Sequence, residues 1–206
     1  VNEGYLVAMH ANALGVADGT VSNATFVTTT AAAAGSLHIA NVTIGNEALT
    51  IEGEGQSENG VLQASGNAVI NGTVTTLDGV TLTANLGVQF TFKGPIKGPG
   101  PLWLANGGTF VFANSNNTFT DGVDLGAGGT HDSKVLIAAN NAIPLVPVQH
   151  VPAQTLLTVG SGVQQTFGAI TGPGALRLTD AQSVLTLNGA AERTFEGGIS
   201  GSGVIR

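Results

Sequence analysis

The sequence contains no cysteine and few charged residues, and these two deficits limit what the protein can be. Without cysteine there is no thiol nucleophile, and a chain exported through an oxidising compartment cannot form wrong disulfides. Charged residues make up only 9% of the chain, against about a quarter in average globular domains. Six Lys and Arg against thirteen Asp and Glu give a net charge of −7. Nucleic acids and anionic membrane surfaces are bound through basic patches, so we expect neither as a partner.

Long apolar runs and helical periodicity are also missing. No run of about 18 apolar residues occurs, so no membrane insertion is expected within this segment. Residues 1–14 lack the basic start and the continuous apolar stretch of a signal peptide, and we expect any targeting segment to lie outside this chain. What the chain has instead is 31 glycines and many Thr, Asn, Ser and Ala residues. A polar but uncharged surface of this kind favours β-structure with tight turns.

A glycine motif recurs along the chain. It reads I-x-G-x-G-x-[L/I] and occurs at 96–102, 170–176 and 199–205, with a Thr-Phe pair shortly before each copy. Two glycines at a spacing of two remove the side chains from one face of an extended segment, so a neighbouring backbone can come close. A unit that repeats in the sequence indicates a structural unit that repeats, most often by stacking of the chain on itself.

Between the glycine-rich turns, short segments alternate apolar residues with other residues, which predicts strands of about three to five residues. We expect their apolar members to point inward and to form one continuous core. This predicted core includes Leu102, Leu104, Phe110, Phe112, Leu176, Leu178, Leu185 and Leu187.

Two all-β architectures fit these strands. The repeat favours a parallel β-solenoid (β-helix), which at ~20–25 residues per coil would have roughly nine coils. The alternative is an antiparallel β-sandwich, which the hairpin-type dipeptides Asn71-Gly72, Asp78-Gly79 and Asp121-Gly122 would favour. The proline-rich stretch 144–152 is not expected to pair as a central strand, and we place it along the side of the rod.

The order of these motifs resembles a known family. The glycine motif at 96–102, the Asn-Asn-Thr-Phe-Thr-Asp-Gly sequence at 116–122 and Asn-Ala-Ile at 141–143 are similar to the autotransporter-associated β-strand repeat of bacterial type V secretion. Segments 1–15 and 168–206 resemble partial copies, 35–91 fits only loosely, and 126–134 and the proline stretch depart from the pattern. The resemblance implies a right-handed parallel β-helix, an extracellular location or attachment to the bacterial outer membrane through a missing region, and a mainly structural passenger.

Acidic residues are the first candidates for catalysis, because enzymes that cleave polysaccharides use paired carboxylates. Glu52, Glu54 and Glu58 lie close in sequence, as do Asp121 and Asp124, but solvated turn acids are the plainer interpretation. The four histidines are scattered, no G-x-S-x-G sequence occurs, and the glycine motif lacks the Lys-Ser/Thr and the helix of a phosphate loop. We therefore expect no catalytic, metal or cofactor site, and no enzyme activity.

A possible binding surface can be identified from two features. The single tryptophan lies between two leucines of a predicted strand and should point outward, where its ring could bind a sugar or a partner or merely cover a coil edge. The loop 126–134 resembles half of a calcium-binding nonapeptide, but a histidine replaces the third glycine and the unit does not repeat. The possible binding surface comprises Trp103, Thr130, His131 and Asp132.

Three functions remain open, and the leading one is structural: an exported cell-surface rod that spaces or displays other parts. The alternatives are an adhesin that binds a glycan or a host surface, and a polysaccharide-degrading enzyme. We expect residues 1–206 to be a single segment of a longer repeat protein, because the chain opens in mid-repeat and closes just after a new motif, without the polar caps of solenoid ends. Its expected partners are neighbouring coils of the same longer chain or copies stacked end to end, with a surface glycan as a further possibility.

Overall fold

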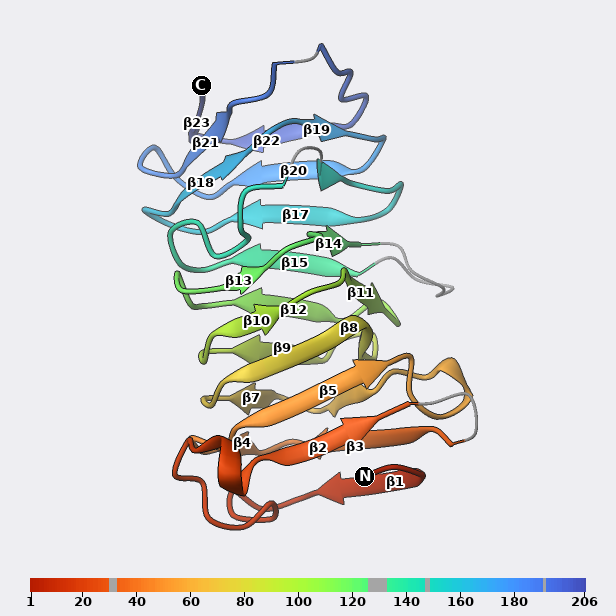
Figure 1. Cartoon of the computed structure of the whole chain (residues 1–206). Helices are drawn as coiled ribbons and strands as arrows, with labels where there is room; N and C mark the ends of the chain where they lie inside the picture. Colours follow the sequence, from red (N-terminus) through yellow and green to blue (C-terminus); the bar gives the residue numbers. More distant parts are fainter. Residues whose placement is uncertain (30–32, 126–132, 147–148, 191) are drawn as a thin grey trace.

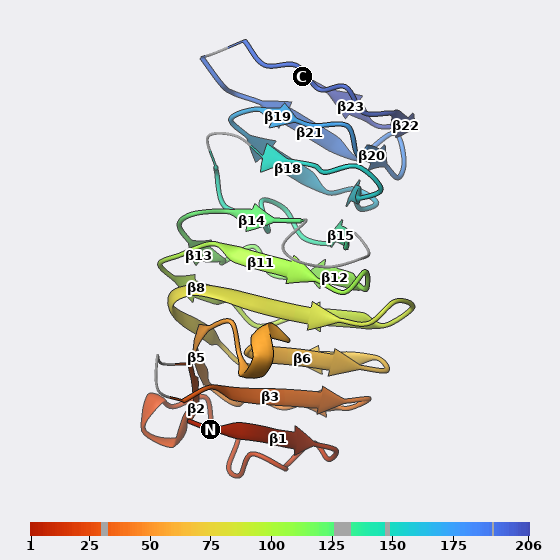
Figure 2. The ribbon, with the colours of Figure 1, turned by 90° about the vertical axis from the view of Figure 1, so that its right-hand side faces the viewer.

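In the computed structural model the chain winds into a parallel β-solenoid of about eight turns (Figures 1 and 2). The structure describes residues 1–29, 33–125, 133–146, 149–190 and 192–206. All ladders between its strands are parallel, and the two termini lie at opposite ends of the stack. The predicted solenoid is confirmed and the antiparallel sandwich is wrong. The described part contains no α-helix, only two short 3₁₀ turns, η1 (Val21–Asn23) and η2 (Gln56–Glu58).

Most coils contribute a strand to each of three faces of the rod. Face 1 is one continuous sheet formed by β4 (Thr43–Ile44), β7 (Ala68–Ile70), β9 (Gln89–Phe92), β12 (Thr109–Phe112), β15 (Lys134–Ile137), β17 (Leu156–Val159), β20 (Ala175–Leu178) and β22 (Ile199–Gly201). Face 2 comprises β2 (Thr25–Thr28), β5 (Leu49–Gly53), the first half of β8 (Val74–Ala84), β10 (Ile96–Gly98), β13 (Thr118–Phe119), β18 (Gln164–Phe167), β21 (Val184–Leu187) and β23 (Val204–Ile205). Face 3 comprises β1 (Gly4–Ala8), β3 (Gly35–Ala40), β6 (Leu62–Ser65), the second half of β8, β11 (Leu102–Ala105), β14 (Val123–Asp124), β16 (Gln149–His150) and β19 (Ile170–Thr171).

The coils differ in length because loops of different size leave the corners of the rod. The registers place Leu176 directly after Leu157 on face 1, 19 residues on, whereas Gly35 follows Gly4 on face 3 only after 31 residues. Coils longer than the predicted length reduce the predicted nine turns to about eight.

The core runs through the whole stack, and phenylalanine rings pack against one another at its centre. The rings of Phe90 and Phe92 lie 4.5 Å apart, and Phe112 contacts Phe92 at 5.9 Å and Phe119 at 6.3 Å between centroids. All members of the predicted core are buried except Leu187, which is 40% exposed. That part of the prediction is wrong because β23 covers Leu185 but ends before it reaches Leu187.

The glycine motif marks corners of the rod. Its three copies join β10 to β11, β19 to β20, and β22 to β23, so each copy occupies a different corner. A Cβ atom at any of its glycines would overlap an atom of the preceding coil; at Gly98 that atom is the carbonyl oxygen of Thr76, and at Gly172 it is that of Val151. The predicted close backbone approach is confirmed, and it explains why only glycine fits.

The hairpin-type dipeptides do not form hairpins. Asp78-Gly79 lies inside β8, where the strand bends from face 2 to face 3, and a Cβ at Gly79 would lie 2.6 Å from Cη2 of Trp103. A Cβ at Gly72 would overlap the carbonyl oxygen of Glu47 in the preceding coil. Glycine has no side chain, and for this reason it is common in hairpin turns. In this structure the missing side chain instead lets neighbouring coils come into contact.

Within the proline-rich stretch 144–152, which we expected along the side of the rod, residues 149–150 join the stack as an edge strand of a two-stranded sheet, and not as a central strand. Gln149 and His150 form β16, which pairs in parallel with β19. The prolines lie outside these two residues, so the amides of Gln149 and Val151 remain available and donate to Ala169 and Thr171 at 2.8 and 2.9 Å. A short strand between prolines can therefore form the edge of a ladder.

Buried amide side chains replace ladder hydrogen bonds where the strands are short. Asn117 accepts a hydrogen bond from the Ile96 amide at 2.7 Å and donates to the carbonyls of Ala142 at 2.6 Å and Asn114 at 2.9 Å. It thereby links the coils on either side of its own. Gln165 continues the series by donating to the Ile143 carbonyl at 2.7 Å.

We predict that Asn117→Ala lowers the free energy of unfolding by about 2–4 kcal/mol, because it leaves a buried amide and a buried carbonyl without partners. The matched control is Asn116→Ala next to it, whose side chain is exposed and whose loss should change stability by no more than about 0.5 kcal/mol. Urea unfolding followed by circular dichroism measures both. Equal effects of the two substitutions would contradict the bridging role of Asn117.

Candidate functional site

Trp103 points outward from β11, as the alternation predicts, with buried leucines on either side of it. In the ladder it lies between Thr81 of β8 and Asp124 of β14. Its ring packs on the glycine at position 79, and the side chain is half-buried. One edge of the indole therefore covers the bend in β8, and the side chain as a whole is partly exposed.

The other members of the predicted binding surface, Thr130, His131 and Asp132, lie outside the described residues. The structure resumes at Ser133, which is buried, and β15 begins at Lys134. Asp124 is the acidic residue that the structure does bring to the tryptophan, and it is exposed at the end of β14. Trp103 and Asp124 together form the candidate site on face 3.

The candidate catalytic acids are spread over the rod. Glu52 lies in β5, and by register it is three coils away from the segment that contains Asp121, which corresponds to roughly 14 Å at ~4.8 Å per coil. The Asp121 carboxylate accepts a hydrogen bond from the Gly100 amide at 3.1 Å and so fixes a corner glycine. Lys97 and Lys134, which flank Asp121 and Asp124 in sequence, belong to faces 2 and 1.

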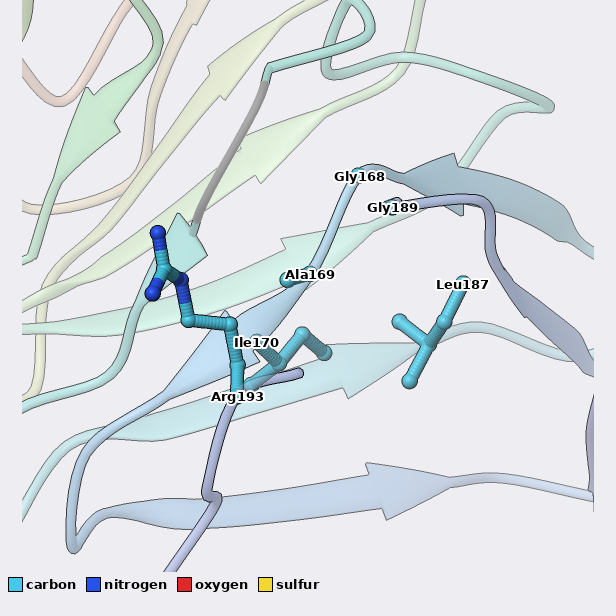
Figure 3. A pocket seen from close by; sticks show the side chains of 6 residues that line it. All are labelled: Gly168, Ala169, Ile170, Leu187, Gly189 and Arg193. Atoms are coloured by element: carbon cyan, nitrogen blue, oxygen red, sulfur yellow. The ribbon is translucent and has the colours of Figure 1, made fainter. Parts of the chain in front are cut away.

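Near the C-terminal end, two coils form a shallow hollow that sequence reasoning missed. Its volume is about 140 Å³, below the roughly 300 Å³ of a small ligand pocket. Figure 3 shows Arg193 at one side of the hollow and Leu187 at the other, with Ile170 and Ala169 between them. An apolar floor beside one guanidinium group can accept a small anionic group such as a carboxylate, but Arg193 is the only charged residue among the described residues that line the hollow.

A second hollow of about 280 Å³ lies at the corner between faces 3 and 1. It is lined by residues 154–156 and 173–175, together with Gly198. The hydroxyl of Thr155 is buried there and has no hydrogen-bond partner among the described residues. Apart from Gln154 and Thr155, its described lining is apolar or glycine, so no charged side chain there could orient a ligand.

No family model, curated protein or solved structure matches the chain. The geometry therefore establishes a parallel β-solenoid, and the likeness to the autotransporter repeat rests on the sequence motifs alone. In the described part of the chain, no group of three or more His, Asp or Glu residues is arranged to hold a metal ion. No helix there is long and apolar enough to cross a membrane.

One aspartate connects two turns on the outside of the rod. Asp180 accepts hydrogen bonds from the hydroxyl of Ser161 and the amide of Gly162 in the preceding coil, and from the amide and hydroxyl of Ser183 in its own turn. These bonds, above all the one from Ser161, lower the pKa of Asp180 from 3.8 to about 2. The carboxylate therefore stays ionised into strongly acidic solution and acts as a turn-to-turn clamp.

Proposed function

We propose that this chain is a structural segment of an exported, cell-surface β-helical rod of the autotransporter passenger kind, which spaces or displays other parts of a longer protein. The observation that carries the proposal is the uninterrupted core, which extends from Leu37 on face 3 to Leu185 on face 2. Such a stack is a stiff spacer, and its length grows with the number of coils. The motifs at 96–102, 116–122 and 141–143 support the autotransporter kind.

Export fits the local character of the contacts. Each strand pairs only with strands of the coils directly before and after it, so the stack can grow coil by coil from one end. The absence of cysteine removes any dependence on disulfide formation during passage through an oxidising compartment. A chain with these two properties can fold progressively, coil by coil, after translocation.

We propose no catalytic role for the chain. The two carboxyl groups of a glycosidase lie roughly 5–9.5 Å apart, whereas Glu52 and the segment of Asp121 are separated by three coils. The Asp121 carboxylate accepts a hydrogen bond from the Gly100 amide at a corner of the rod, and this structural role explains its position without catalysis.

Surface display tests the leading proposal. We predict that the chain, placed between a signal peptide and an outer-membrane translocator in a Gram-negative host, reaches the surface and binds antibody on intact cells. Its six Lys and Arg residues should resist trypsin there once the coils have formed. The control is a Phe112→Asp variant, which places a charge in the core and should become sensitive to trypsin. Retention of the unchanged chain inside the cell would contradict the proposal.

A glycan-binding role is the second candidate. It is favoured by the partly exposed side chain of Trp103, which is in register with the exposed residue Asp124. Sugars stack on indole rings through their apolar faces, and carboxylates accept hydrogen bonds from sugar hydroxyls. Because Asp124 is in register with Trp103, aminated saccharides are tested beside neutral ones.

Because Trp103 is the single tryptophan, its fluorescence reports directly on this surface. We predict that titration with a binding oligosaccharide shifts the emission to shorter wavelength and that Trp103→Ala abolishes binding in a glycan array. Phe26→Ala is the matched control, since it removes an exposed aromatic residue from another face. Unchanged emission across neutral and aminated oligosaccharides would contradict the glycan-binding role.

A further inference from the structure

The chain contains the sequence Asn-x-Thr, with x other than proline, at four places. This sequence is the acceptor for N-linked sugars, which are attached at the surface of exported proteins. The four acceptor asparagines are all exposed, and none of them lies in a β-strand. They are Asn23, Asn41, Asn71 and Asn116.

Three of the four acceptors follow one another along a single corner of the rod. Asn23, Asn71 and Asn116 lie shortly before β2, β8 and β13, where the chain enters face 2. β5 lies between the first two of these strands, and β10 lies between the last two. The acceptors therefore recur at every second coil, which corresponds to roughly 10 Å at ~4.8 Å per coil. A sugar is wider than one coil spacing, and this interval leaves room for a saccharide at each position.

Two asparagines of this row have free side chains. Asn71 and Asn116 form no side-chain hydrogen bond with any described residue. Asn23 differs, because its side-chain nitrogen donates a hydrogen bond to the carboxylate of Asp18 at 2.7 Å. A sugar on Asn71 or Asn116 would therefore disturb no bond of the fold, whereas a sugar on Asn23 would crowd Asp18.

The fourth acceptor, Asn41, lies at another corner, between β3 and β4, and its side chain is engaged by the following coil. Its side-chain oxygen accepts a hydrogen bond from the amide of Asn67 at 3.2 Å. A Cβ atom at Gly66 would lie only 2.7 Å from Cβ of Asn41, so the two coils are in close contact there. The fold therefore separates four equivalent sequence motifs into two free acceptors and two engaged ones.

We propose that Asn71 and Asn116 carry N-linked saccharides, in preference to Asn23 and Asn41. A transferase that acts on the folded coils supplies the sugar as a glycosyl pyrophosphate. The side-chain nitrogen forms a bond to the anomeric carbon of the sugar, and the bond from that carbon to the phosphate oxygen breaks. The diphosphate group leaves with the electron pair, and the nitrogen releases one proton.

Saccharides at this corner would hydrate a rod in which only 9% of the residues are charged. The inference goes beyond the spacing role of the rod. It rests on the proposal that the chain reaches the cell surface, where sugars of this kind are found.

Mass spectrometry of proteolytic peptides, from the protein produced in its own cells, tests the proposal. We expect the peptides that contain Asn71 or Asn116 to be heavier by whole sugar residues. Modification at Asn23 and Asn41 should reach less than about a tenth of that extent, although they lie in the same acceptor sequence. A single hexose would identify a nucleotide sugar as the donor, and a preassembled oligosaccharide would identify a lipid-linked donor.

Two substitutions of one threonine separate loss of the acceptor from loss of the fold. Thr118→Val removes the hydroxyl of the acceptor sequence but keeps Asn116, and the sugar at Asn116 should fall to less than about a tenth of its original level. Thr118→Ser keeps a hydroxyl and should keep the sugar. The matched control is Asn46→Gln, which changes an exposed asparagine of the same corner that has no Thr or Ser two residues later and should leave the saccharides unchanged.

The proposal is overturned if either Asn71 or Asn116 lacks sugar, if Asn23 and Asn41 are modified to the same extent, or if Thr118→Val keeps the sugar. An unmodified chain at the cell surface would overturn this proposal and leave the export proposal intact. A chain that stays inside the cell would contradict export, and its peptides would still decide the question of modification.

Discussion

The close approach of one coil to the next is the constraint on which the rest of the structure depends. A parallel ladder continues around a corner only if the backbone of the following coil can come within contact distance there, and a Cβ at Gly98 or Gly172 would prevent this. The corners are therefore glycine-rich, and turn residues such as Asp121 and Asp180 add hydrogen bonds to the same regions. Low charge is consistent with this design, because stacked coils place equivalent side chains only ~4.8 Å apart.

Much of the fold was predictable because stacking imposes the same local pattern on every coil. Period-2 alternation placed Leu102, Leu104 and Phe112 in the core, and the glycine motif indicated a chain stacked on itself. The predictions that were wrong concern features that the neighbouring coil decides. Asp78-Gly79 carries a hairpin sequence, but the bend in β8 and the indole above it decide its conformation. Leu187 has a core pattern, and its exposure follows from where β23 ends.

The candidate site was less predictable for the same reason. The alternation of apolar residues predicted that the Trp103 side chain points outward, because the direction of a side chain depends only on its position within the strand. Its contact with Gly79 and its place beside Asp124 depend on the length of two coils, and coil lengths vary between 19 and 31 residues. The hollow beside Arg193 combines segments from two coils, and nothing in either segment alone signals it.

The central claim is that successive coils stack in parallel, one coil spacing apart, and spin-label distances on face 1 test it most directly. The cysteine-free chain accepts pairs of labelled cysteines at Thr43 with Thr158 and at Thr43 with Arg177, which the registers place five and six coils apart. The solenoid predicts backbone separations of roughly 24 Å and 29 Å, which differ by one coil spacing. Distances that do not increase by about 5 Å between the two pairs would contradict the parallel stack.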